Sequence, residues 1–119
     1  MKLVACLRAS DPTYCGVEEI SMEFLVHMEV ARIEGGEEKE TQLREQEAAR
    51  SRELARQGLL VRLWRVPGRR ENWGIWKAAD ADQLHAAFVS LPLFSYLKIT
   101  VHPLASHPND PMMLHTSNG

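Results

Sequence analysis

Cysteine and long apolar runs are scarce in this sequence of 119 residues, and each absence excludes a class of protein. The two cysteines, Cys6 and Cys15, form neither a CxxC pair nor a disulfide framework, which is typical of a reducing compartment. No stretch approaches the ~20 apolar residues that cross a bilayer, and Arg8 interrupts the first apolar run before it reaches the length of a secretory signal. We therefore expect a cytoplasmic protein without a membrane-spanning segment.

The motifs that hold metals, phosphates and catalytic nucleophiles are also missing. There is no HExxH motif, no Cys-rich cluster, no phosphate-binding glycine loop and no GxSxG elbow. His102 and His107 do not have a recognised ligand spacing. A net charge of -2 provides no field that attracts nucleic acid or an anionic membrane. We expect a protein that uses no metal or other cofactor and binds neither nucleic acid nor membrane.

The composition is that of a globular protein, with 45% hydrophobic and 25% charged residues, and the length suits one domain. Residues 1–21 contain Gly, Pro, Ser and both cysteines and show no period, whereas Met22 begins a strongly patterned segment. We predict an N-terminal extension over 1–21, a folded domain over 22–108 and a polar C-terminal tail over 109–119.

Hydrophobic periodicity within the domain predicts six elements. Residues 22–30 alternate as a half-buried strand, and 37–57 have the composition of a long helix. Strands are expected over 59–66, 72–77 and 96–101, and a second helix follows Asp80, with Gln83 in the capping-box position. This β-α-β-β-α-β order indicates an α+β, ferredoxin-like antiparallel sheet with helices on one face. A second subunit is the simplest cover for the other face.

Four segments in register resemble the muconolactone isomerase family. They are MEFLVHM at 22–28, LWRVPG at 63–68, LPLFSY at 91–96 and PLASHP at 103–108. The resemblance implies a dimeric α+β barrel and a homo-oligomer built from dimers, decameric in typical members. It also implies a cofactor-free proton shift that converts muconolactone to the enol-lactone of 3-oxoadipate in aromatic-compound catabolism, the β-ketoadipate pathway.

The sequence departs from the family pattern in segments that should line the pocket. Where the family has a Glu-Lys pair in the first helix, this chain has Glu47-Ala48, and Arg70 and Trp73 stand where the family typically has tyrosines. Two alternatives therefore stay open. One is a related isomerase or cyclase acting on a different small organic acid in a biosynthetic pathway, and the other is a non-catalytic ligand-binding barrel protein.

A proton shift beside a lactone carbonyl needs a base that also returns the proton, and donors for the developing oxyanion. Glu47 is the candidate base, because it falls with Leu43, Ser51 and Leu54 on one stripe of the first helix, where burial would raise its pKa. The structural alternative is an ion pair with Arg50 or with an arginine of the sheet.

Further polar and aromatic side chains are candidates for substrate contacts. Arg65 matches the family's arginine and could bind a carboxylate in a bidentate contact, or serve as a structural ion-pair partner. Asn72 could donate to the oxyanion or to its own turn. His27 is a candidate second acid-base group, or simply an exposed strand residue. The remaining candidates for the pocket wall, for which packing is the alternative, are Trp64, Trp73, Trp76 and Tyr96.

Overall fold

A computed structural model of the chain describes residues 21–112. The strands are β1 (Met22–Val30), β2 (Leu60–Arg65), β3 (Glu71–Ala78) and β4 (Leu97–Leu104). The helices are α1 (Glu37–Arg56) and α2 (Ala81–Val89), and a 3-10 turn, η1 (Phe94–Tyr96), precedes β4. Except for Ser21, the predicted N-terminal extension lies outside the described residues, as do residues 113–119 of the predicted tail.

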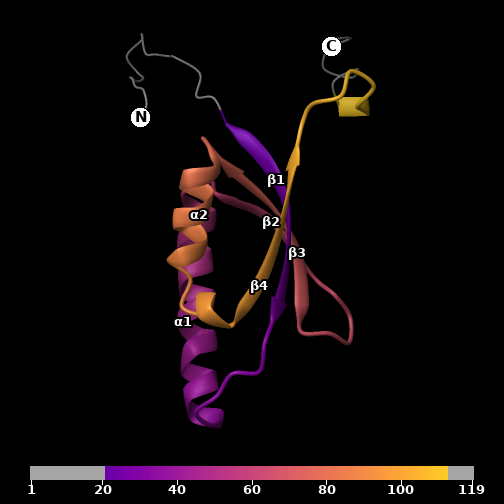
Figure 1. The fold of residues 1–119 in the computed structure, drawn as a ribbon. Coiled ribbons are helices and arrows are strands. Elements are labelled where there is room, and N and C mark those ends of the chain that lie inside the picture. The colour runs from indigo at the N-terminus through magenta and orange to yellow at the C-terminus, as the bar shows by residue number, and fades with distance from the viewer. Residues whose placement is uncertain (1–20, 113–119) are drawn as a thin grey trace, which may run out of the picture.

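The four strands form one antiparallel sheet in the order β2-β3-β1-β4. Each β-α-β crossover therefore leaves space for one strand: β3 lies between β1 and β2, and β1 lies between β3 and β4. Both helices lie on the same side of the sheet (Figure 1). This arrangement confirms the predicted ferredoxin-like α+β fold with both helices on one face of the sheet.

The core lies between this sheet and the two helices. Phe24, Val26 and Met28 alternate along β1 toward the helices and are almost fully buried. Leu54 is the one fully buried residue of α1. Trp76 of β3 packs edge-on against Phe88, a residue of α2, with ring centroids 5.1 Å apart. These contacts hold both helices on one face of the sheet.

The helix ends follow from local signals in the sequence. Asp80 caps α2, because its Oδ1 accepts the backbone N–H of Gln83 at 2.9 Å. Gln83 completes the exchange by accepting the N–H of Ala79 at 2.6 Å. At the end of α1, Gly58 adopts a φ of 84°, and the N–H of Leu59 returns to the carbonyl of Leu54 at 3.0 Å. That pattern is a Schellman motif, which needs a residue that accepts positive φ.

The last strand differs from its predicted range of 96–101. Tyr96 belongs to η1, and its carbonyl accepts the N–H of Ala31 at 2.7 Å, so β4 begins only at Leu97. The strand then continues to Leu104 through Pro103. A proline is tolerated there because β4 is an edge strand, which has a neighbour on one side only.

The sheet face that neither helix covers, called the open face here, carries the residues that alternate with the core. Strand register places His27 opposite Trp73 and Trp64 opposite Trp73 on this face, because directly paired residues of antiparallel strands point the same way. Trp64 is 44% exposed. In the described part of the chain, neither helix is long and apolar enough to cross a membrane.

Candidate active site

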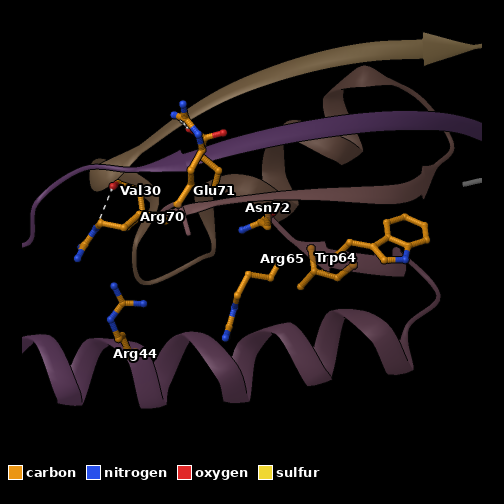
Figure 2. A pocket seen from close by; sticks show the side chains of 9 residues that line it. Val30, Arg44, Trp64, Arg65, Arg70, Glu71 and Asn72 are labelled. Carbon is orange, nitrogen blue, oxygen red and sulfur yellow. Dashed lines mark hydrogen bonds and ion pairs between the residues drawn. The ribbon is translucent and has the colours of Figure 1, made fainter. Parts of the chain in front are cut away.

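A cavity of about 620 Å³ opens between α1 and the ends of β2 and β3 (Figure 2). Its wall combines Arg44 of α1 and Val30 of β1 with residues of β2, of β3 and of the turn that joins β2 to β3. The lining residues are Val30, Arg44, Leu63, Trp64, Arg65, Arg69, Arg70, Glu71 and Asn72. Arginine is the commonest residue type among them, so the cavity is suited to an anionic ligand.

Arg65 and Asn72 lie opposite one another in the register of β2 and β3. Both alternate with residues of the open face, so their side chains point toward α1, as Figure 2 shows for Arg65. Among residues 21–112, Arg65 pairs with no carboxylate and the Asn72 side chain has no hydrogen-bond partner. Both donors are therefore available to a ligand, and the predicted turn contact of Asn72 is not made.

Glu47 lies on the half-buried stripe of α1 that the sequence predicts. Its Oε1 accepts the backbone N–H of Leu93 at 3.0 Å. Burial raises the pKa of the Glu47 carboxyl above the ordinary glutamate value, and the Leu93 hydrogen bond opposes this only in part. The segment after α2 thus supplies the partner of Glu47, a contact between distant parts of the chain.

The ion pair considered for Glu47 is not formed within the described residues. Arg50, its nearest candidate partner in sequence, donates instead to the Ser90 hydroxyl at 2.9 Å. Glu47 does not line the cavity, although Arg44, one helical turn earlier on α1, does. The structure therefore brings Arg65 and Asn72 together in the cavity and places Glu47 outside its lining, one helical turn from Arg44 on α1.

Three arginines of the cavity were not among the site residues predicted from the sequence, although Arg70 was noted as a departure from the family pattern in a segment that should line the pocket. Arg44 donates from Nε to Glu40 Oε2 at 3.0 Å, and Arg70 Nη2 lies 3.8 Å from the same oxygen. Arg69 Nη1 donates to Glu71 Oε2 at 3.2 Å. The charged turn was visible in the sequence, but its position opposite Arg44 depends on how α1 packs on the sheet.

A family model described as muconolactone delta-isomerase matches residues 22–110. The chain belongs to the muconolactone delta-isomerase family. The muconolactone delta-isomerase of Rhodococcus opacus is 41% identical over 64 residues, which cover 54% of this chain and 69% of that protein. That of Cupriavidus pinatubonensis is 39% identical over 67 residues, or 56% of this chain and 73% of the relative.

The same family is found among solved structures. A crystal structure of muconolactone isomerase superposes with a TM-score of 0.70 at 32% sequence identity, covering 76% of this chain and 95% of that one. The β-α-β-β-α-β sheet described above is therefore the muconolactone isomerase fold.

His27 and Trp73 were predicted for the site of this muconolactone isomerase family member, but they lie on the opposite side of the sheet from the cavity interior. On the open face, His27 Nε2 lies 3.0 Å from Glu71 Oε1, and the His27 ring centroid is 4.5 Å from that of Trp73. Trp64 points to the same face, where the guanidinium of Arg62 lies 4.6 Å from its ring centroid, but it also contributes to the cavity wall.

Two further predicted contacts are not found in the cavity. The ring of Trp76 is only 3% exposed and fills the core beside Phe88, so its role here is packing. Tyr96 lies in η1, where its described hydrogen bonds are made by the backbone. Alternation along β3 places Trp73 and Trp76 on opposite faces, but it does not show which face the helices cover, since both faces of this sheet carry aromatic residues. Residues 21–112 contain no group of three or more His, Cys, Asp or Glu positioned to hold a metal ion.

Proposed function

We propose that this chain isomerises muconolactone to the enol-lactone of 3-oxoadipate, a step in the catabolism of aromatic compounds. Membership of the family supports the reaction, and Glu47 is the observation in the structure that supports its chemistry. A half-buried carboxylate with a raised pKa and no paired cation among the described residues is a stronger base than an ordinary glutamate.

Glu47 would take a proton from a carbon of the lactone and return it to another carbon, so that atoms and charge balance over the cycle. Its Oε1 is held by the Leu93 N–H, which leaves Oε2 as the atom that accepts the proton. Holding one oxygen fixes the direction of the other, and a base that is already oriented needs less reorganisation during the reaction.

Arg65 and Asn72 would act on the oxygens of the substrate. The Arg65 guanidinium has no carboxylate partner in the described chain, and its planar fork suits bidentate binding of the substrate carboxylate. The Asn72 amide lies opposite it in the strand register and would donate to the lactone oxygen as negative charge develops there. Trp64 would limit the open end of the cavity.

A second copy of the chain would cover the open face, as the family resemblance implies. Trp64 is 44% and Leu104 42% exposed, and both point to that face by strand register. Exposed aromatic and aliphatic side chains on one sheet face are typical of a subunit interface. The unit would be a dimer, assembled into a larger homo-oligomer in the cytoplasm, with His27 and Trp73 at the interface.

The test is conversion of muconolactone by the purified chain after exhaustive treatment with chelator. Proton NMR should show loss of muconolactone and formation of the enol-lactone with no cofactor added. As a control, Arg52→Gln changes an exposed residue of α1 outside the cavity and should retain the full rate. Conversion no faster than in buffer alone would overturn the proposal, and activity that returns only with added zinc would overturn its cofactor-free form.

A further inference from the structure

Most of the positive charge in the cavity is already paired with carboxylates of the same chain. Four arginines line the cavity. Arg69 donates from Nη1 to Glu71 Oε2 at 3.2 Å. Arg44 donates from Nε to Glu40 Oε2 at 3.0 Å, and Arg70 Nη2 lies 3.8 Å from the same oxygen. Three of the four cavity arginines therefore have a carboxylate partner within the protein.

Arg65 differs from the other three. Within residues 21–112 its guanidinium pairs with no carboxylate. Its side chain points toward α1 and lies apart from Arg44 and Arg70 in Figure 2. An unpaired guanidinium offers its whole planar fork to a ligand, whereas a paired guanidinium must share its donors with the carboxylate that it already contacts. A substrate with one carboxylate therefore has one preferred partner in this cavity.

Glu40 compensates two arginines from different segments of the chain. It lies one helical turn before Arg44 on α1, the spacing at which helical side chains form ion pairs. Arg70 comes from the turn between β2 and β3 to meet the same carboxylate. The other contacts of Arg70 go to the carbonyls of Val30 and Ala31 at 3.4 Å each, which is long for a hydrogen bond. Loss of the charge on Glu40 would therefore free both guanidinium groups at once.

We propose that Glu40 sets the orientation of the substrate in the cavity. By compensating Arg44 and Arg70, it leaves a single unpaired guanidinium among the described cavity residues, that of Arg65. This inference rests on the proposed function, in which the substrate has one carboxylate. With Glu40 in place, that carboxylate binds Arg65 and the lactone ring lies beside Asn72. Without the charge of Glu40, the carboxylate has a competing partner, and the ring is also held in a second, unproductive orientation.

The kinetics of Glu40→Gln have a signature that a structural role would not produce. Unproductive binding competes with productive binding but changes neither the free enzyme nor the transition state. The kcat and the KM for muconolactone should therefore fall by the same factor, and kcat/KM should stay within about twofold of wild type. We expect a factor of about two to five, the effect of an exposed ion pair worth up to about 1 kcal/mol. A fall in kcat with an unchanged KM, or a larger fall in kcat/KM, would overturn the inference.

Binding of an unreactive analogue tests the same role without turnover. The saturated lactone acid, in which the ring double bond of muconolactone is reduced, keeps the single carboxylate and has no double bond to shift. Isothermal titration calorimetry should show that Glu40→Gln binds this acid about two- to fivefold more tightly than wild type. The gain should shrink at high ionic strength, because salt screens it. The uncharged methyl ester of the acid should show no gain, and a gain with the ester would contradict the inference.

Two further variants locate the effect. Arg65→Gln should weaken binding of the lactone acid less in the Glu40→Gln background than in wild type, because Arg44 and Arg70 then hold the carboxylate. An equal loss in both backgrounds would overturn the inference. As a control, Glu45→Gln removes the same charge from an exposed position of α1 outside the cavity, and it should leave binding and kinetics unchanged. A gain of the same size in Glu45→Gln would indicate an effect of net charge alone and would also overturn the inference. Far-UV circular dichroism checks the fold of each variant.

The two proposals fail separately. A chain that isomerises muconolactone, but whose Glu40→Gln variant gains no affinity for the lactone acid, would contradict the role of Glu40 and leave the proposed function intact. A chain that shows this gain, with the smaller effect of Arg65→Gln, but does not isomerise muconolactone would support the role of Glu40 in orienting an anion and overturn the proposed reaction.

Discussion

Replacing Glu47 by glutamine separates its role in catalysis from its role in stability. The amide has the shape of the carboxylate, and its oxygen can still accept the Leu93 N–H that Oε1 accepts now at 3.0 Å. It cannot take a proton from carbon, so the general base is lost. Loss of a general base typically lowers the rate by about 10²–10⁴-fold, which corresponds to about 2.7–5.4 kcal/mol of activation free energy.

The free energy of unfolding should change far less. The hydrogen bond to Leu93 weakens when its acceptor loses the charge, but the cost of half-burying that charge is also removed. No buried cation among the described residues is left unpaired, so the penalty of about 3–5 kcal/mol for breaking a buried ion pair does not apply. We expect a change within about 1 kcal/mol, or several degrees in melting temperature.

The difference in stability between wild type and Glu47→Gln should depend on pH, and the pKa shift of Glu47 gives its direction. Because the folded-state pKa of Glu47 is raised, the carboxyl contributes stability below its unfolded-state pKa, and this contribution is lost as pH rises through the folded-state pKa. Glutamine does not titrate. The melting temperature of Glu47→Gln should therefore improve relative to wild type between acid and neutral pH.

Kinetics and thermal melting on one preparation decide the question. Glu45→Gln removes the same charge from an exposed position of α1 and should keep both the rate and the melting temperature. A folded Glu47→Gln variant with a near wild-type rate would refute the assignment of the base. His27, now placed against Glu71 on the open face, would be the next residue to test.

Three further outcomes are expected. Arg65→Gln should lower kcat/KM by about 10–100-fold, the value of a charged hydrogen bond of roughly 1.5–3 kcal/mol, and steady-state kinetics showing no change would remove Arg65 from the site. The pKa of the Glu71 carboxyl is lowered by its hydrogen bonds, to His27 first and to Arg69 second. Glu71→Gln should therefore melt below wild type at neutral pH, and this difference in melting temperature should vanish as pH falls through the folded-state pKa. A difference that does not depend on pH would contradict this. Light scattering at micromolar concentration should show an oligomer, and a stable monomer would contradict a second copy on the open face.

The elements of this fold could be predicted because each has a local cause. Alternation along residues 22–30 reflects burial of one strand face, and the Asp80–Gln83 exchange is a contact within four residues. Glu47 could be predicted as half-buried for the same reason, since the period of α1 places it beside Leu43 and Leu54. The end of β4 was placed too early because its position at the sheet edge, which tolerates Pro103, is a property of the strand order.

Arg65, Asn72 and Trp64 were predicted for the site and line the cavity. The rest of the lining could not be predicted, because it depends on contacts between distant segments. Arg44 and Arg70 meet only once α1 is packed against the sheet, and the Leu93 N–H reaches Glu47 only once α2 is in place. The spacing of Trp73 and Trp76 also places them on opposite faces of a strand, but only the packing of the helices shows that Trp76 fills the core and Trp73 lies on the open face.

The dependence of kcat/KM on pH tests the central claim, that a half-buried Glu47 moves the proton, most directly. A free-enzyme base must be deprotonated to act, so kcat/KM should fall about tenfold per pH unit below its pKa. We expect this acid limb to lie above the ordinary glutamate pKa, as burial of Glu47 requires, and to be absent from the residual activity of Glu47→Gln. An acid limb at the ordinary glutamate pKa, or one that persists in Glu47→Gln, would contradict it.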